Sequence, residues 1–240
     1  MDFPETIKMP IFHGIKSKIL SIKNIIKNLF ECGFDFRPKN LYFVKDRYEL
    51  YEKYFIKKCP KNGIILDIGS GAHPFRKATI LADKYLETTR HRNEQLVIDD
   101  RDFILLDLEY LPFKDKSIDY VYCCHLLEHV DSPEKCSQEL MRIAKAGYIE
   151  TPNFANDVLF RWAKGMHKWH TVKINNKLVF FEYTEKELKG VRTRFWIDTI
   201  FSPSPYRNQI QDIFYKNQDL FNTILEWSDH FEVIVYRLDK

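Results

Sequence analysis

The sequence lacks the features that mark secreted, disulfide-stabilised and membrane-spanning proteins. Its five cysteines are an odd number and none stands in a Cys-x-x-Cys pair, which argues against a disulfide framework and a zinc ribbon. The opening residues, MDFPETIKMP, carry acids and a proline where a signal peptide needs a basic start and a continuous apolar stretch. No apolar run reaches the length that spans a bilayer. We therefore expect a soluble, cytoplasmic protein.

A strong charge of either sign is also absent. A formal charge of +3 over 240 residues does not indicate a nucleic-acid or membrane partner. No basic and aromatic recognition motif for nucleic acid stands in the sequence either. With 45% hydrophobic and 15% aromatic residues the chain can bury a full core, which excludes wholesale disorder. The length fits one domain with small additions.

Isoleucine and leucine recur at helical spacing in residues 11–31, with lysines between them. This pattern predicts a basic amphipathic helix that packs on the domain or, alternatively, lies on a membrane surface. A second helical pattern covers about 44–58 and ends at the break Cys59–Gly63. We expect residues 1–60 to form an N-terminal helical extension and residues 61–240 to form the main domain.

Between residues 63 and 152, short β-rich runs alternate with turns and helical patterns. Continuous apolar strands in such an alternation predict an α/β fold with a mostly parallel sheet and helices on both faces. The predicted strands are Ile64–Ile68, Thr79–Ala82, Phe103–Leu106, Ile118–Cys123 and Gly147–Ile149.

The remainder of the chain, 153–240, is less regular. The runs His170–Ile174 and Leu178–Tyr183 flank two asparagines and predict a β-hairpin, inserted at about 160–185. The other elements predicted in this zone are helices near 207–216 and 218–227 and a final strand at Phe231–Arg237.

The most informative segment is the sequence LDIGSGAHP, Leu66–Pro74. An apolar strand runs into a glycine turn at the carboxyl edge of the predicted sheet, where open α/β folds bind their ligands. Gly69 and Gly71 permit a tight turn and a close approach of the ligand to the backbone. A dinucleotide-binding fingerprint needs a third glycine at the position of Pro74, so its absence argues against a bound pyrophosphate.

Acidic residues stand at the ends of three successive predicted strands. Asp67 fits a cationic ligand with an amino group and a sulfonium better than it fits a phosphate. Asp83 can accept hydrogen bonds from both hydroxyls of a ribose. The Asp107 carboxylate and the Leu108 backbone N–H can together bind an adenine edge. In register with the glycine turn, the three acids predict one crevice for a sulfonium nucleoside.

In these residues the sequence resembles the class I S-adenosylmethionine-dependent methyltransferases, specifically the subgroup related to ubiquinone-biosynthesis methyltransferases. The segments LDLEYLPF (106–113), SIDYVYCCHLLEHV (117–130) and GYIETPN (147–153) extend the likeness in the family's order. The resemblance implies a Rossmann-like fold with a seven-stranded sheet and bound S-adenosylmethionine. The implied cofactor contacts are Asp67, Gly69 and Gly71 for the methionine part, Asp83 for the ribose, and Asp107 with Leu108 for the adenine. We also expect Ser70 of the turn to contact the cofactor, and His125 to pack beside it unless it binds a metal.

One departure from the family concerns the first helix of the domain. Few residues separate the glycine turn from Asp83. We therefore expect that helix to be reduced to a turn or two.

The segment His125–His129 matches an inverted zinc-peptidase motif, His-x-x-Glu-His. On a helix, His125, Glu128 and His129 would share one face and could bind one ion. The β-run before the motif and Asp131–Glu134 after it, which we expect to cap the next helix, leave no room for a peptidase's long active-site helix. Some small-RNA and ubiquinone-pathway methyltransferases resemble this stretch but carry Glu-x-x-Glu-His and hold a divalent ion there. Because the first member here is histidine, we expect no metal, with these three residues as the alternative ligand set.

Methyl transfer from a sulfonium depends mainly on positioning, although an oxygen or amine acceptor can need a base. His125, Glu128 and His129 follow the fourth predicted strand at the cofactor edge and are the candidate catalytic residues. Candidate acceptor contacts are Asn153, His167 and Trp169, with Trp169 alternatively anchoring the hairpin.

We expect a methyltransferase acting on a small molecule, a glycan or a glycan precursor, with O-methylation as the reaction. One alternative is an RNA methyltransferase with a divalent metal at the HLLEH segment. Another is a non-catalytic methyltransferase-like binding module, against which the intact glycine turn and acids argue. The oligomeric state does not follow from the sequence.

Overall fold

The computed structural model describes residues 42–43, 52–89, 92, 94–160, 166–184, 206–207 and 217–238. The helix predicted at 11–31 lies outside the described residues, as do most of the helix predicted at 44–58 and most of the one at 207–216. The division into an extension and a main domain stays a prediction.

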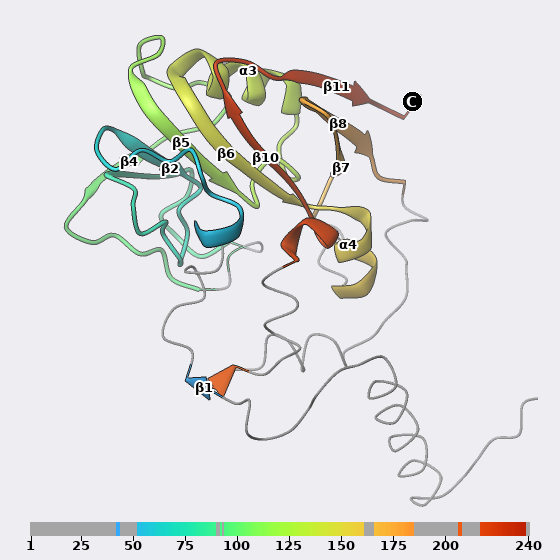
Figure 1. Cartoon of the computed structure of the whole chain (residues 1–240), viewed down its shortest axis with the longest axis horizontal. Helices are drawn as coiled ribbons and strands as arrows, with labels where there is room; N and C mark the ends of the chain where they lie inside the picture. The colour runs from blue at the N-terminus through green and yellow to red at the C-terminus, as the bar shows by residue number, and fades with distance from the viewer. Residues whose placement is uncertain are drawn as a thin grey trace, which may run out of the picture.

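A six-stranded sheet forms the centre of the described structure (Figure 1). Its strand order is β10-β6-β5-β2-β3-β4. Every neighbouring pair runs parallel except β10 and β6, which are antiparallel. The strands are β2 (Ile65–Ile68), β3 (Ile80–Asp83), β4 (Asp102–Leu105), β5 (Ile118–Cys124), β6 (Ala144–Pro152) and β10 (Asn222–Ser228).

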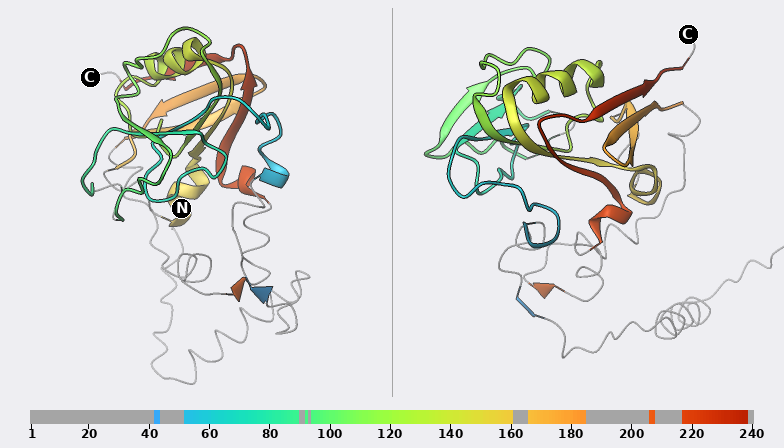
Figure 2. Two further views of the ribbon diagram at one scale, coloured as in Figure 1. Left: turned by 90° about the vertical axis from the view of Figure 1, so that its left-hand side faces the viewer. Right: turned by 45° about the horizontal axis from the view of Figure 1, so that its top comes forward.

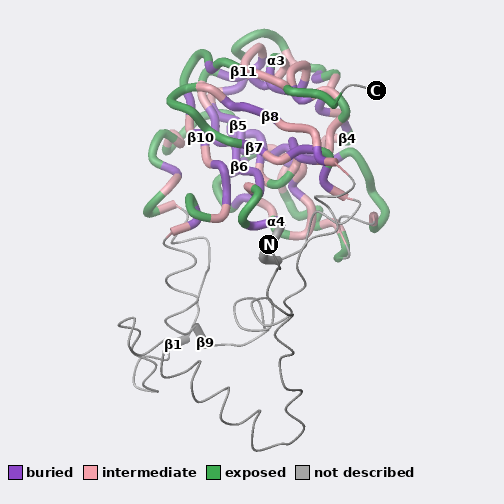
Figure 3. The backbone as a smooth tube through the Cα atoms, turned by 90° about the vertical axis from the view of Figure 1, so that its right-hand side faces the viewer, coloured by how far each residue is buried: buried purple, intermediate pink, exposed green. Residues whose placement is uncertain are grey.

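Both faces of this sheet are buried, as the continuous apolar strands predict. Successive strand residues alternate between two apolar clusters, so Leu66 packs in one and Ile65 in the other. In Figure 3 the central strands are accordingly drawn largely in purple, the colour of buried residues. The mostly parallel α/β architecture expected from the sequence is therefore confirmed.

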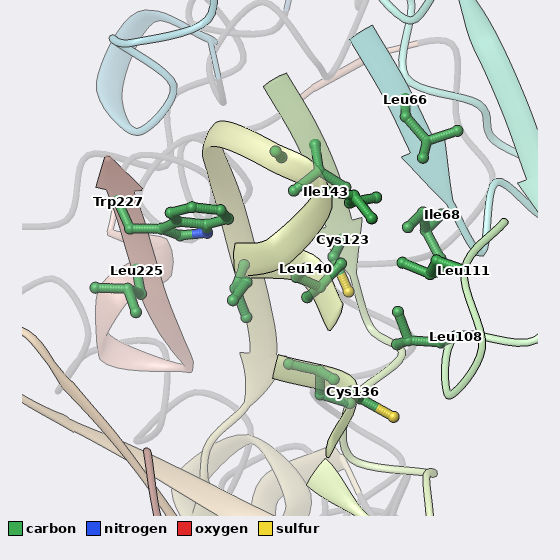
Figure 4. Close-up of a cluster of buried hydrophobic side chains, with 14 of the residues drawn as sticks. Leu66, Ile68, Leu108, Leu111, Cys123, Cys136, Leu140, Ile143, Leu225 and Trp227 are labelled. Carbon is green, nitrogen blue, oxygen red and sulfur yellow. The ribbon is translucent and has the colours of Figure 1, made fainter. Parts of the chain in front are cut away.

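Helix α3 (Pro133–Ile143) covers one face of the sheet. Its buried residues Leu140 and Ile143 pack among Leu66, Cys123 and Trp227 of the strands (Figure 4). The helix begins with Pro133 at its first turn, where a missing N–H is tolerated. The predicted helix start after Asp131 is thus confirmed, although the Ser132 side chain makes no capping hydrogen bond.

A three-stranded sheet packs beside the main sheet (Figures 1 and 2). It contains β7 (Trp169–Ile174) and β8 (Lys177–Glu182), the predicted hairpin, and β11 (Glu232–Tyr236), the predicted final strand. Asn175 in the hairpin turn has a φ of 55°, a left-handed conformation that asparagine tolerates well. Strand β11 pairs with β8 in this second sheet, parallel to it.

Two smaller elements complete the description. Helix α4 (Phe154–Phe160) follows β6, and the 3-10 helix η3 (Gln218–Leu220) precedes β10. Strands β1 (Tyr42–Phe43) and β9 (Tyr206–Arg207) pair as a short antiparallel ribbon.

Two expectations need correction. The helix predicted at 218–227 is wrong, because β10 occupies Asn222–Ser228 and pairs along its whole length with β6. Thr223, Leu225 and Trp227 are the buried residues of an alternating strand, a period of two that was taken for a helical one. The glycine turn is followed by turns and no helix. The described residues form six strands of the main sheet, and the expected seventh strand stays a prediction.

Across the described ranges, no helix has both the length and the apolar character that crossing a membrane requires.

Gly147 on β6 marks a close contact inside the core. A Cβ at this position would lie 2.6 Å from Val121 Cγ1 and 2.8 Å from the Val121 carbonyl oxygen. We expect Gly147→Ala to lower the free energy of unfolding by about 1–3 kcal/mol through overpacking, measured by urea denaturation. The control Ala146→Gly, at the next residue, should cost only about 0.5–1 kcal/mol. Equal losses in the two variants would contradict the packing seen here.

Candidate active site

A cavity of about 1160 Å³ opens at the carboxyl ends of the five parallel strands. Its walls are residues at or just after the carboxyl ends of β2, β3, β4, β5 and β6, together with residues of α4, η3 and the hairpin. Parallel strands bring these ends to one edge of a sheet, which is where α/β folds bind ligands.

The glycine turn after β2 forms the floor of this cavity. Gly69 and Gly71 have φ values of 78° and 55°, in the left-handed region that glycine adopts without strain. The N–H groups of Gly69 and Ser70 both donate to the Ala82 carbonyl, at 2.8 and 3.0 Å, which fixes the turn against β3. A Cβ on Gly69 would lie 3.1 Å from the Leu126 side chain. The predicted tight turn is therefore present.

The three strand-end acids Asp67, Asp83 and Asp107 all line this one cavity, as the sequence predicts. Ser70, Gly71, Leu108 and His125 line it as well.

Asp67 is the most deeply buried of the three acids, with 2% of its surface exposed. Its Oδ2 accepts a 2.7 Å hydrogen bond from the Phe75 N–H, which also holds the loop after the turn. Burial raises the pKa of Asp67 to about 7, although the Phe75 N–H and the charge of Arg101 act in the opposite direction. No cation among the described residues forms an ion pair with Asp67, because Arg101 pairs with Asp99.

The other two acids each carry a cationic partner. Asp83 Oδ2 accepts hydrogen bonds from the Gly71 N–H at 3.2 Å and from Arg92 Nη1 at 2.8 Å. The Lys84 ammonium lies 2.7 Å from Asp107 Oδ2. Burial opposes ionisation of Asp107, but Lys84 and the Glu109 N–H outweigh it and lower the pKa of that carboxyl.

Arg92 was not identified from the sequence. Its Nη2 donates to the carbonyls of Tyr85 and Glu87 at 2.9 and 2.6 Å, and the guanidinium is mostly buried against Asp83. It stands in an irregular loop between β3 and β4, where no spacing or motif distinguishes it from other surface arginines.

The HLLEH segment after β5 is a turn, with no helix at 125–129. This agrees with the argument against a zinc peptidase. His125 has a φ of 53°, a strained value for a residue with a side chain. Its imidazole lies between two buried carboxylates, 3.6 Å from Glu128 and 3.4 Å from Glu150.

The protonation of His125 bears on its predicted role as a base. Burial disfavours the charged imidazole, but Cys124, Glu128 and Glu150 together raise the pKa of His125 above its ordinary value. An imidazolium donates a proton and does not accept one. The role of His125 as a catalytic base stays a prediction.

His167, from the loop before β7, joins the HLLEH residues in the cavity wall. Its Nδ1 bonds Asp157 Oδ1 at 2.8 Å, and Tyr183 donates to Asp157 Oδ2 at 2.6 Å. Asp157 and Tyr183 were not singled out in the sequence. No local motif could have joined them, since they come from α4 and from the segment after β8.

Two predicted acceptor contacts lie elsewhere. Asn153 does not line the cavity, and its Oδ1 accepts a hydrogen bond from the Asn156 N–H at the start of α4, which is the role of a helix cap. Trp169 is 2% exposed, and its Nε1 donates to the Val130 carbonyl at 2.8 Å. Trp169 thus anchors the hairpin to the main domain, which was the alternative reading of this residue.

Comparison with known proteins agrees with this geometry. Residues 66–149 match the methyltransferase domain. The match covers the glycine turn, all three acids and the HLLEH segment, about a third of the chain. It bears out the resemblance to methyltransferases drawn from these residues, whereas the ubiquinone-biosynthesis subgroup stays a prediction. No curated protein matches the chain.

Several solved structures show a looser likeness. A protein from Anabaena variabilis, provisionally assigned as a methyltransferase of an antibiotic biosynthesis pathway, is 19% identical with a TM-score of 0.36, over 50% of this chain and 49% of its own. A Pyrococcus horikoshii protein is 20% identical with a TM-score of 0.38, over 53% and 63%. A Methanosarcina mazei S-adenosylmethionine-dependent methyltransferase is 16% identical with a TM-score of 0.33, over 55% and 77%.

The chain thus spans about half the length of the Anabaena protein and less than two thirds of the Pyrococcus protein. At these identities and TM-scores, none of the likenesses bears on substrate or mechanism.

The burial of Asp67 makes a prediction about pH. Its folded-state pKa of about 7 lies above the ordinary 3.8, so ionisation opposes folding as the pH rises through that window. Asp67→Asn keeps an acceptor for the Phe75 N–H but cannot ionise. We expect the stability of this variant relative to the native protein to increase as the pH rises from about 4 to 7 and then to level off. Urea denaturation at a series of pH values measures it.

Asp107→Asn is the matched control, because the pKa of Asp107 is lowered in the folded state. Its stability relative to the native protein should fall as the pH rises to about 4 and stay constant from 4 to 7, since the ionised carboxylate supports folding above its unfolded-state pKa of 3.8. If the relative stabilities of the two variants followed the same pH trend, burial would not be raising the pKa of Asp67.

Proposed function

We propose that the protein is an S-adenosylmethionine-dependent methyltransferase. The observation that carries this proposal is the convergence of the glycine turn, Asp67, Asp83 and Asp107 on one cavity, within the segment that matches the methyltransferase domain. A sulfonium nucleoside has a cationic end, a ribose and an adenine, and the cavity offers one group suited to each in chain order.

Charge balance supports the orientation of the cofactor. Asp83 and Asp107 are each neutralised by a neighbouring cation, at 2.8 and 2.7 Å. Of the three strand-end acids, Asp67 is the one left for a cationic ligand, and it lies beside Gly69 and Gly71, where the backbone allows close approach. We assign the methionine part of the cofactor to this end of the cavity, in contact with the glycine turn and Ser70.

The ribose and adenine are assigned to the next two strand ends. Asp83 Oδ1 accepts a single hydrogen bond from the Tyr85 N–H, so a carboxylate lone pair remains for a ribose hydroxyl. Asp107 and the buried Leu108 are assigned to the adenine edge. Arg92 holds Asp83 in place and acts as a positioning residue for the ribose.

The chemistry required of the protein is alignment. In the reaction the bond between the methyl carbon and the sulfonium sulfur breaks, and the sulfur keeps the electron pair and becomes a neutral thioether. A lone pair of the acceptor forms the new bond to carbon, and the acceptor's proton passes to a base or to water. Holding the two reactants in line supplies most of the rate.

The acceptor is assigned to the part of the cavity beyond Leu126. Its walls include the buried amides Asn156, Gln218 and Asn222, together with histidines of the HLLEH segment and His167. The Lys168 ammonium there pairs with Asp131. Such a wall suits hydroxyl groups more than phosphates, which supports a small molecule, a glycan or a glycan precursor methylated on oxygen, and gives no support to RNA.

Calorimetry with S-adenosylmethionine tests the cofactor assignment. We expect the native protein to bind and Asp107→Asn to bind at least about tenfold more weakly, the effect of losing roughly 1.4 kcal/mol. Asn153→Ala, outside the cavity, should keep the native affinity although its helix cap is lost. No binding by the native protein would leave the non-catalytic binding module as the better reading.

The affinity for S-adenosylmethionine measured in this titration should also depend on pH. Because the cationic cofactor favours ionised Asp67, the affinity of the protein for the cofactor should increase as the pH rises toward about 7, by at most about tenfold per pH unit, and then level off. Asp67→Asn should bind more weakly and lose this dependence. A steep dependence that persists in the variant would place the titrating group elsewhere.

The acceptor class is tested by transfer of a labelled methyl group to fractionated cell extract. Label in the glycan or small-molecule fraction is the expected outcome. Label in RNA would overturn the proposed acceptor class while leaving the transferase activity in place.

A further inference from the structure

The structure assigns a binding site for a divalent transition-metal ion to Glu128, His129 and His167, in the acceptor half of the cavity. This differs from the ligand set that the HLLEH motif offers in sequence, because His167 takes the place of His125. The existence of the site does not depend on the proposed function, although its role in the reaction does.

A backbone connection brings the three residues together. The N–H of Lys168 donates to the Glu128 carbonyl at 2.8 Å, which ties the start of the hairpin to the turn after β5. One ligand atom of each of Glu128, His129 and His167 consequently lies within 4.8 Å of the others. Two ligands bound at about 2.1 Å to one ion are at most about 4.2 Å apart, so small side-chain shifts would complete coordination.

Glu128 is the observation that points to a cation here. Its side chain is fully buried, and neither carboxylate oxygen accepts a hydrogen bond from any residue that the structure describes. The nearest imidazole nitrogens, of His125 and His129, are 3.6 Å away, beyond hydrogen-bond distance. At that distance the two imidazoles can balance part of the Glu128 charge without donating a hydrogen bond, and a bound cation would complete the compensation that a buried carboxylate needs.

The two histidines are oriented as metal ligands are. His129 Nδ1 lies 3.0 Å from the Met166 carbonyl, and His167 Nδ1 lies 2.8 Å from Asp157. Each acceptor favours a proton on Nδ1, which leaves the lone pair on Nε2. A carboxylate or carbonyl behind the distal nitrogen is the usual outer shell of a ligating histidine. Tyr183 in turn holds Asp157, so His167 has a complete supporting shell.

A neighbouring group of similar composition serves as an internal contrast. Cys124, His125 and Glu150 also lie within ligand distance of one another. The carboxylate of Glu150, however, already accepts hydrogen bonds from Tyr148 and from Asn222, the latter at 2.9 Å. The Glu150 carboxylate therefore already has hydrogen-bond donors, and we assign no metal ion to this second group.

The donor set indicates the class of metal. Two imidazoles and one carboxylate suit Zn²⁺, Co²⁺, Mn²⁺ or Fe²⁺ better than Mg²⁺ or Ca²⁺, which prefer oxygen alone. Three protein ligands leave a coordination position open toward the cavity. A metal there would bind the acceptor oxygen and lower its pKa, which removes the need for a separate base.

The test uses the full chain without a histidine tag, stripped of metal by a chelator. Titration with Co²⁺, followed by visible absorption, and with Zn²⁺, followed by calorimetry, should show one site. We expect Glu128→Gln and His167→Ala to abolish that site. Asp157→Asn should weaken binding about 10- to 100-fold, the usual effect of losing an outer-shell partner.

His125→Ala and Glu150→Gln are the controls and should keep metal binding. If His125→Ala lost the ion as completely as His167→Ala, the geometric assignment would be wrong and the motif set correct. Failure of the native protein to bind any of Zn²⁺, Co²⁺ or Mn²⁺ would overturn the site altogether.

Thermal denaturation separates loss of ligand from loss of fold. Metal should raise the melting temperature of the native protein and of His125→Ala, but not that of Glu128→Gln. Metal-free Glu128→Gln should melt no lower than the metal-free native protein, because the substitution removes a buried charge. S-adenosylmethionine binding, measured without metal, distinguishes a failure of this site from a failure of the proposed function.

Discussion

Parallel pairing of β2 with β3 and with β5 is the constraint on which the rest of the molecule depends. It directs the carboxyl ends of these strands to one edge, so that residues far apart in sequence face one space. Both faces of the sheet are packed with apolar side chains, so an acid on either face would be buried without a polar partner. Acids are best tolerated at the strand ends. The fold therefore has a polar edge and a dry interior.

Charge is distributed unevenly along that edge. On the side of β3 and β4, each acid is matched by a cation from the segment between these two strands, Arg92 for Asp83 and Lys84 for Asp107. On the side of β5 and β6 the buried carboxylates of Glu128 and Glu150 are surrounded by histidines, a tyrosine and amides. Asp67 stands between these two groups. A ligand with one localised positive charge is thus drawn to the centre of the cavity, where the proposed methyl donor presents its sulfonium.

The two halves of the cavity also differ in how they are built. The cofactor half is made of short segments that follow the strands, and its geometry is set by backbone hydrogen bonds such as those from Gly69 and Ser70 to Ala82. The other half is assembled from α4, η3 and the hairpin, and side-chain contacts hold it, with Trp169 fastening the hairpin and Asp157 orienting His167. Sequence changes in the second half can alter the acceptor without disturbing the first.

The sequence alone determined the parallel sheet, the glycine turn and the three strand-end acids, because each is a local pattern whose consequence follows from strand direction and glycine geometry. It also identified the hairpin, whose asparagine turn is local. It failed for β10, since a segment at an antiparallel edge adopts the structure of its partner, and the pairing of Asn222–Ser228 with β6 is a long-range contact. Only the tertiary structure placed Arg92 on Asp83, brought His167 and Asp157 to Glu128, and left Asn153 outside the cavity. These contacts join loops from different parts of the chain. Side-chain packing and charge compensation determine them, and neither leaves a periodic pattern in the sequence.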